Sequence, residues 1–155
     1  MRKMIGLIYP IPVVFVDRLF DGKTKVFVKF LAHTSTKAAP RHKVIFYASN
    51  GPKKLVGEGT IRKVEFLTPE RVLAKYKDEL FLNEAELSAY VKRSSWTPRT
   101  MRDSKEMLTL VLRNLRKYSK PIEYNKPITM AGQYLTAEEY DSLMKNQKGE
   151  AIAHS

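Results

Sequence analysis

The apolar residues of this chain occur in short runs that are rich in β-branched and aromatic side chains and are separated by glycine and proline. Runs of this kind predict strands that are buried on at least one face. Five segments are expected to be strands: Met4–Tyr9, Lys25–Phe30, Lys43–Ala48, Leu55–Leu67 and Met107–Leu112. In the long fourth segment Gly57 or Gly59 permits a bulge, because the missing side chain lets the backbone bend.

Helix-start signals lie between these strands and after the last of them. Pro12 suits the first turn of a short helix over Val13–Phe20. Thr68-Pro69 and the capping boxes at Asn83–Glu86 and Thr136–Glu139 predict helices ending near residues 77, 91 and 145. A frame rich in strands with helices in its middle predicts an α+β fold: a small mixed or antiparallel β-barrel with short helices packed outside.

The size of the chain limits its organisation. A sequence of 155 residues with 43% hydrophobic content is enough for one core, so we expect a single domain over 1–145 and a disordered tail over 146–155. No apolar run approaches the roughly 20 residues that cross a bilayer. Pro10 and Pro12 interrupt the apolar start, which argues against a signal peptide. We therefore expect a cytoplasmic protein without membrane contact.

Some kinds of chemistry are excluded or disfavoured by composition. The chain has no cysteine, so it has neither disulfides nor a thiolate metal site. Its three histidines (His33, His42 and His154) are too far apart for a local metal motif. We expect no metal and no cofactor.

Positive charge dominates the surface and is unevenly distributed. The net charge is +12, from 28 Lys+Arg against 16 Asp+Glu. Two basic segments, 1–63 and 92–126, flank an acidic one over 64–91. Such a field attracts polyanions, and nucleic acid is the most abundant of them. The alternative is a lysine-rich surface that only keeps the protein soluble.

Three stretches together resemble the PUA-like superfamily, within which ASCH and EVE domains are nearest. They are Val13–Lys29 (VVFVDRLFDGKTKVFVK), Val56–Leu67 (VGEGTIRKVEFL) and the helix opening at Asn83. The wider sequence, including KPITMAGQYLTAEEY, is similar to an uncharacterised archaeal family of that superfamily. The resemblance covers about residues 1–115. It implies a small β-barrel with a cleft between barrel and helices, in which most characterised relatives bind RNA or a modified base.

Some ASCH proteins instead hydrolyse the amide of an acetylated cytidine with a lysine, a threonine and a glutamate. Gly22 and Lys23 match the glycine and lysine of these enzymes, and Lys29 stands where they often have arginine. Their strand glutamate falls on Val26 or Phe27, and their nucleophilic threonine also falls on an apolar residue. The resemblance therefore favours binding over hydrolysis.

Lys23, Lys25 and Lys29 form the first candidate phosphate contact, because alternation along a strand places them on one face. The alternative is that these lysines keep an exposed strand soluble. A second group contains Trp96, the single tryptophan, which is suited to stacking on an unpaired base. Its candidate phosphate contacts are Arg93, Arg99 and Arg102, continued by Arg113, Arg116 and Lys117. The alternative is that Trp96 plugs the end of the barrel.

We therefore expect a protein that binds RNA, such as tRNA or rRNA, and that recognises a modified or flipped nucleotide in a basic cleft. A second hypothesis is a hydrolase of a modified nucleoside or nucleotide that uses Lys23 and Thr24. Its carboxylate would be Glu58 or, alternatively, Glu79, Glu84 or Glu86. Glu58 lies between two glycines and equally suits a solvent-facing strand position. A third hypothesis is an accessory protein of a ribonucleoprotein.

Overall fold

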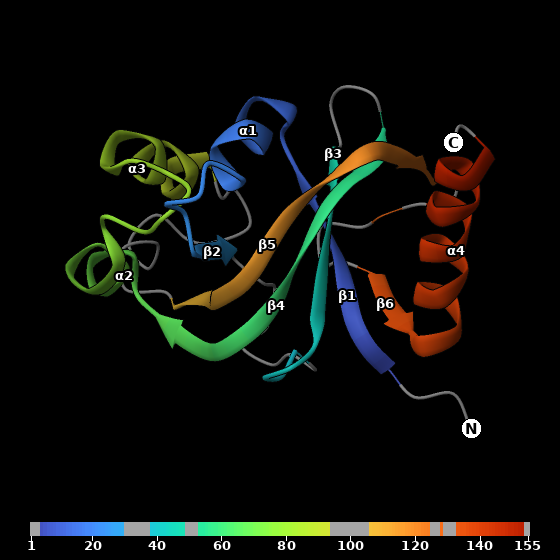
Figure 1. Ribbon diagram of the computed structural model, residues 1–155. Helices are drawn as coiled ribbons and strands as arrows, with labels where there is room; N and C mark the ends of the chain where they lie inside the picture. Colours follow the sequence, from blue (N-terminus) through green and yellow to red (C-terminus); the bar gives the residue numbers. More distant parts are fainter. Residues whose placement is uncertain are drawn as a thin grey trace.

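The computed structural model describes residues 4–29, 38–48, 53–93, 106–124, 128 and 133–153, and its centre is one six-stranded sheet (Figure 1). The strands are β1 (Met4–Ile11), β2 (Val26–Lys29), β3 (Lys43–Ala48), β4 (Lys54–Leu67), β5 (Met107–Glu123) and β6 (Gln133–Thr136). Their order across the sheet is β2-β5-β4-β3-β1-β6. The β1–β3 pair is parallel and the other four pairs are antiparallel, so the predicted mixed sheet is confirmed.

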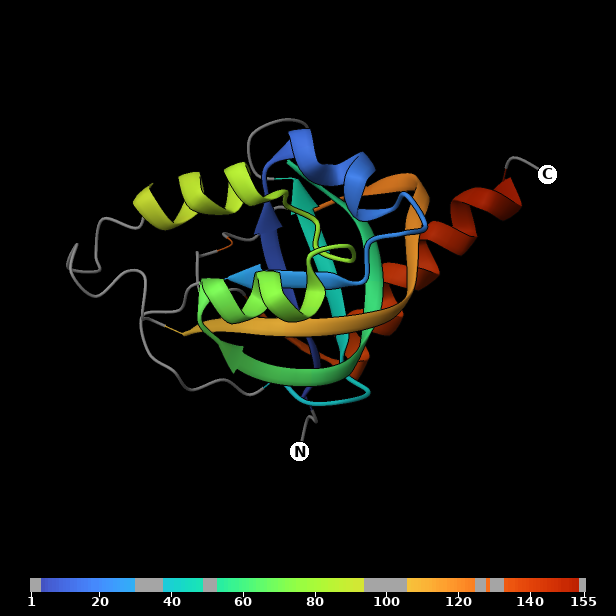
Figure 2. The same cartoon turned by 90° about the vertical axis from the view of Figure 1, so that its left-hand side faces the viewer.

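The predicted barrel is not closed. β2 and β6 are the two edges of the sheet, and no ladder joins them in the described part of the chain. Each edge strand is only four residues long, which leaves few backbone groups for a closing ladder. The sheet is instead strongly curved, and β4 and β5 bend together around one side of the molecule (Figure 2).

Three of the helices begin where the capping signals predict, and the helix expected over Val13–Phe20 is divided into a 3-10 turn and a short α-helix. The helices are η1 (Val13–Phe15), α1 (Val16–Leu19), α2 (Pro69–Tyr76), α3 (Glu84–Arg93) and α4 (Ala137–Ala153). At α2 the Thr68 hydroxyl accepts a bond from the Arg71 amide at 3.4 Å. The capping boxes of α3 and α4 form both reciprocal bonds, at 2.8 and 2.8 Å for α3 and at 3.1 and 3.2 Å for α4. Each box satisfies two amides that the helix leaves without a partner.

The largest differences from the sequence-based expectation are two element ends and one additional strand. β5 continues eleven residues beyond Leu112, because its basic half still pairs with β4 as far as Lys54↔Glu123. The helix expected to end near Lys145 continues to Ala153. β6 was not expected, since only four residues pair with β1 and they carry no distinct strand pattern.

Each face of the sheet carries its own apolar cluster. The larger cluster packs beneath α1, α2 and α3 and includes Tyr9, Phe27 and Phe46. The smaller one lies under α4 and includes Ile45 and Tyr118. Figures 1 and 2 show α4 on the opposite side of the sheet from the other helices. Consecutive residues of a strand can therefore belong to different clusters, as Ile45 and Phe46 do.

Glu65 links the C-terminal end of β4 to α2. It accepts hydrogen bonds from Lys75 at 2.7 Å and from the Tyr76 hydroxyl, and Lys63 lies 3.3 Å away. Burial raises the pKa of Glu65, but the hydrogen bonds from these three partners outweigh it and lower the pKa to about 2. Glu65 is therefore paired with lysines of β4 and α2.

Candidate functional site

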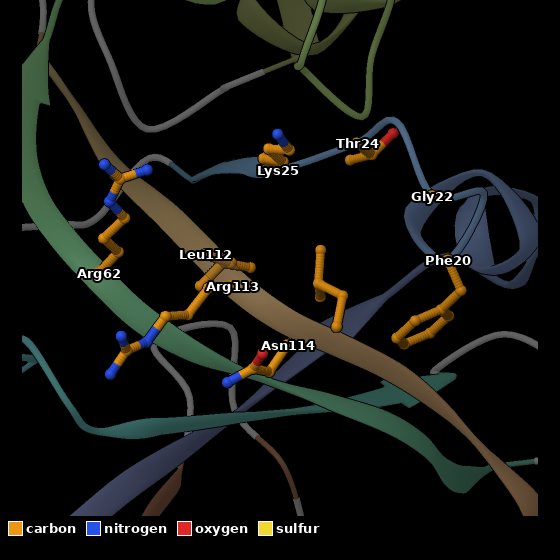
Figure 3. A pocket seen from close by; sticks show the side chains of 9 residues that line it. Phe20, Gly22, Thr24, Lys25, Arg62, Leu112, Arg113 and Asn114 are labelled. Carbon is orange, nitrogen blue, oxygen red and sulfur yellow. The ribbon is translucent and has the colours of Figure 1, made fainter.

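A pocket of about 360 Å³ opens between the turn that follows α1 and the middle of β4 and β5 (Figure 3). Its lining residues are Phe20, Gly22, Thr24, Lys25, Arg62, Leu112, Arg113, Asn114 and Leu115. Figure 3 shows Arg62 and Arg113 on the β4–β5 side, Lys25 and Thr24 along the facing segment, and Phe20 at the α1 end. Cations therefore lie on both sides of the pocket, and the apolar Phe20, Leu112 and Leu115 complete the lining with the neutral residues.

The turn before β2 is held by Asp21. One carboxylate oxygen of Asp21 accepts bonds from the amides of Lys23 at 2.8 Å and Thr24 at 2.9 Å. The Thr24 and Lys23 amides are the main cause of the lowered pKa of Asp21. Gly22 has φ of 85°, a value that L side chains rarely adopt, so glycine is required here. This turn sets Thr24 and Lys25 at the pocket.

The opposite wall is formed by an irregularity in the β4–β5 ladder. Ile61 pairs with Leu112 and Lys63 with Val111, so Arg62 is an extra residue in β4. Such a bulge twists the strand and redirects its side chain. On β5, Asn114 has φ of 53°, a left-handed conformation within a strand. The bulge and Asn114 together shape the floor of the pocket.

The positive charge of the pocket is not neutralised by the described residues. Lys25, Arg62 and Arg113 are exposed, and none forms an ion pair within the described part of the chain. No carboxylate is among the lining residues. Three cations of this kind around one cavity repel one another and therefore favour a bound anion.

The remaining predicted phosphate contacts lie elsewhere. Lys23 is exposed beside the pocket but does not line it, and Lys29 is buried at 4% exposure. Burial lowers the pKa of Lys29 to about 8. Arg116 lies 3.2 Å from Glu58 and Lys117 lies 3.0 Å from Asp17. Lys29 therefore does not share an exposed face with Lys25, because the tertiary fold covers this end of β2.

The Trp96 group falls outside what the structure describes. Trp96, Arg99 and Arg102 lie between residues 94 and 105, and only the backbone of Arg93 is described. Their proposed contacts with bases and phosphates therefore stay predictions.

Glu58 is buried at 2% exposure, so the solvent-facing position considered from the sequence is wrong. Its carboxylate accepts bonds from the hydroxyls of Tyr118 at 2.9 Å and Tyr140 at 2.9 and 3.0 Å. Arg116 lies 3.2 Å away and Lys43 3.4 Å. A buried carboxylate is tolerated only with partners of this kind. We call these five residues the Glu58 cluster.

The Glu58 cluster lies on the α4 side of the sheet. A Cβ on the preceding residue, Gly57, would be 2.3 Å from the Phe20 ring, which places Gly57 on the α1 side. Since successive side chains point to opposite faces, Glu58 points away from Thr24 and the pocket. The predicted set of Lys23, Thr24 and Glu58 is therefore not assembled, because the sheet separates the carboxylate from the turn.

Burial and the nearby carboxylate change the acidity of the tyrosines in the Glu58 cluster. Burial, a hydrogen bond to Glu58 and its charge raise the pKa of Tyr140 to about 12. Burial and the same carboxylate raise the pKa of Tyr118 further. Both hydroxyls therefore remain protonated donors at neutral pH, which suits a structural link between α4 and the sheet.

Sequence reasoning missed the apolar lining residues Phe20, Leu112 and Leu115 and two polar ones, Arg62 and Asn114. Arg62 looked like an ordinary polar position of a long strand, and the nearby glycines pointed only to a bend. Asn114 looked like one residue of a basic tail after Leu112. A polar residue tolerant of positive φ, next to an arginine, was the available signal.

The described residues contain no group of three or more His, Cys, Asp or Glu that could hold a metal ion. No helix among them is long and apolar enough to cross a membrane.

A match to a known family covers most of the chain. The model described as "Domain of unknown function (DUF365)" matches residues 4–137. The chain belongs to this family. It is also 36% identical over 106 residues to "Uncharacterized protein MJECS03" of Methanocaldococcus jannaschii, an overlap that covers 66% of this chain and 97% of that protein. The expected similarity to an uncharacterised archaeal protein is confirmed.

Solved structures show the same fold. The ASCH protein of Zymomonas mobilis superposes with a TM-score of 0.73 at 16% identity, over 92% of this chain and 96% of that one. The N-terminal domain of McrB from Staphylothermus marinus has a TM-score of 0.59 at 17% identity, over 94% and 98%. The predicted ASCH-like, PUA-like α+β fold is thus confirmed, while identities this low show the fold alone.

Proposed function

We propose that this protein binds single-stranded RNA, such as an unpaired region of tRNA or rRNA, and holds one nucleotide of it in the pocket. The observation that carries the proposal is the set of three cations, Lys25, Arg62 and Arg113, around a cavity of about 360 Å³ without a described carboxylate. A volume of this size falls in the usual range for ligand pockets, about 300–1,000 Å³. The resemblance to PUA-like domains supports RNA as the polyanion.

The cationic and the apolar residues of the lining suit the two parts of a nucleotide. Guanidinium groups at Arg62 and Arg113 match the geometry of phosphate oxygens, and the Lys25 ammonium adds a point charge. Phe20, Leu112 and Leu115 offer apolar surface to the face of a base. A duplex keeps its bases stacked, so a single strand or a flipped nucleotide fits this arrangement.

The proposal makes a quantitative prediction about salt. Each phosphate neutralised on a single strand contributes about 0.7 to the slope of log affinity against log salt. Arg62→Ala and Arg113→Ala should therefore each lower that slope by about 0.7 if each contacts one phosphate. Binding of fluorescein-labelled oligouridine and oligoadenosine, followed by fluorescence anisotropy at several potassium chloride concentrations, measures the slope directly.

Two matched variants control for net charge. Arg71→Ala on α2 and Lys145→Ala on α4 each remove one exposed cation that does not line the pocket. They should leave the slope nearly unchanged. Equal losses in control and pocket variants would show a diffuse charge effect and refute a pocket site. RNA binding that is absent, or insensitive to salt, would refute the function itself and favour a protein partner within a ribonucleoprotein.

A further inference from the structure

Asn114 has an unusual backbone for a residue in the middle of a strand. Its φ is 53°, within the 17-residue β5. Among the described residues, Arg41 and Lys53 are the other two non-glycine positions with positive φ, and neither lines the pocket. Asparagine tolerates this region better than most residues, but glycine adopts it more readily. If only the backbone conformation mattered, glycine would therefore suit this position at least as well as asparagine.

The side chain of Asn114 is exposed and lines the pocket between two other lining residues, Arg113 and Leu115. Figure 3 shows its amide beside β5, near the side chain of Arg113. No described residue donates a hydrogen bond to this amide or accepts one from it. Thr24, the other neutral polar residue of the lining, is already bonded to Asp21.

The three cations of the lining gain no base specificity from binding phosphate. Lys25, Arg62 and Arg113 bind phosphate regardless of the base attached to it. An asparagine amide instead presents one donor and one acceptor side by side, the arrangement that pairs with the edge of a base. Asn114 is thus a neutral lining residue whose uncommitted donor and acceptor suit base recognition.

We propose that Asn114 determines base specificity in the pocket by pairing its amide with the edge of the bound nucleobase. This inference rests on the proposed RNA binding. The positive φ of Asn114 then has a functional reason, because it holds the amide in the pocket lining beside Arg113. Leu115 and Phe20 contact the face of the base, while the amide reads its edge.

The test is Asn114→Gly, which removes the amide and keeps a residue suited to positive φ. The thermal midpoint of this variant should therefore be unchanged or higher. The probes are fluorescein-labelled heptamers of adenosine, cytidine and uridine, with affinities measured at one salt concentration. For the wild type, we expect the ratio between the best and the worst heptamer to exceed about fivefold, the lower end for one base-edge pair. In Asn114→Gly the ratio should fall to within about twofold, with the salt slope unchanged.

Lys53→Gly is the matched control, since it also replaces a residue of positive φ (55°) by glycine but lies outside the pocket lining. It should keep the wild-type ratio. A wild type without base preference, or an Asn114→Gly protein that keeps its preference, overturns the inference even when binding depends on Arg62 and Arg113. Loss of that arginine dependence would instead refute the proposed function, so the two failures are distinguishable.

Discussion

Tyr140→Phe should destabilise the protein by removing one hydroxyl from the Glu58 cluster while leaving an aromatic ring of the same shape. The hydroxyl is 2.9 and 3.0 Å from the two carboxylate oxygens of Glu58. Tyr118 and Arg116 continue to bond one of those oxygens, at 2.9 and 3.2 Å. The variant therefore weakens the environment of the carboxylate without leaving it wholly unpaired.

The size of the effect follows from this geometry. A hydrogen bond to a charged group is worth about 1.5–3 kcal/mol, and the remaining partners favour the lower half of that range. We expect the free energy of unfolding to fall by about 2 kcal/mol. For a chain of this length that corresponds to a thermal midpoint lower by about 4–8 °C. Urea unfolding followed by circular dichroism gives the free energy directly.

Alkaline pH provides an independent check of the same bond. The pKa of Tyr140 is raised from an ordinary 10.0 to about 12 in the folded protein. A raised pKa means that the stabilising contribution is complete below pH 10 and is lost as pH rises through 12. The stabilities of wild type and Tyr140→Phe should therefore converge over that interval.

Tyr124→Phe is the matched control. The Tyr124 hydroxyl is buried and has no hydrogen-bond partner among the described residues. Its removal should leave stability unchanged or raise it by up to about 1 kcal/mol, because a buried hydroxyl without a partner is unfavourable. Equal destabilisation by the two substitutions would refute the role assigned to the hydrogen bond between Tyr140 and Glu58.

Three further predictions concern other positions. Gly57→Ala should cost about 1–3 kcal/mol in urea unfolding, because its Cβ would be 2.3 Å from the Phe20 ring and 2.7 Å from a backbone oxygen; Gly59→Ala, which meets only a leucine side chain below 3.4 Å, should cost less. Lys29→Met should raise the free energy of unfolding by about 1–3 kcal/mol at neutral pH, since burial lowers the pKa of Lys29 to about 8. This gain should shrink between pH 8 and 10.5. No gain at neutral pH would contradict the prediction. Glu65→Gln should lower the free energy of unfolding by about 2 kcal/mol at neutral pH. Because the pKa of Glu65 is lowered from 4.5 to about 2, this loss should disappear as pH falls through that interval. A loss that does not depend on pH would refute the prediction.

Much of the local structure could be read from the sequence. The caps at Thr68, Asn83 and Thr136 formed as expected, because each involves residues only three positions apart. The bend of β4 near Gly57 was also foreseen and is present as shifts in register with β5. The part of β5 after Leu112 was not predicted as strand. Its exposed basic residues lack the apolar pattern of a strand, and only pairing with β4 extends β5 to Glu123.

The candidate site was anticipated only in part. Lys25, Thr24 and Arg113 were among the predicted residues, but the participation of Arg62 required the bulge that makes it an extra residue of β4. Lys29 was expected beside Lys25, yet it is buried. Alternation along a strand states which face a residue takes, but not what covers that face.

The sequence by itself determined where the capped helices begin, where five of the six strands start and that the chain carries a large positive charge. These features depend on composition and on residues close together in the chain. The tertiary structure decided which charges remain without a described partner. Glu58 meets Tyr118 across 60 positions and Tyr140 across 82, and the pocket joins Lys25 to Arg62 and Arg113. Contacts over such separations depend on strand order and register, which no short pattern specifies.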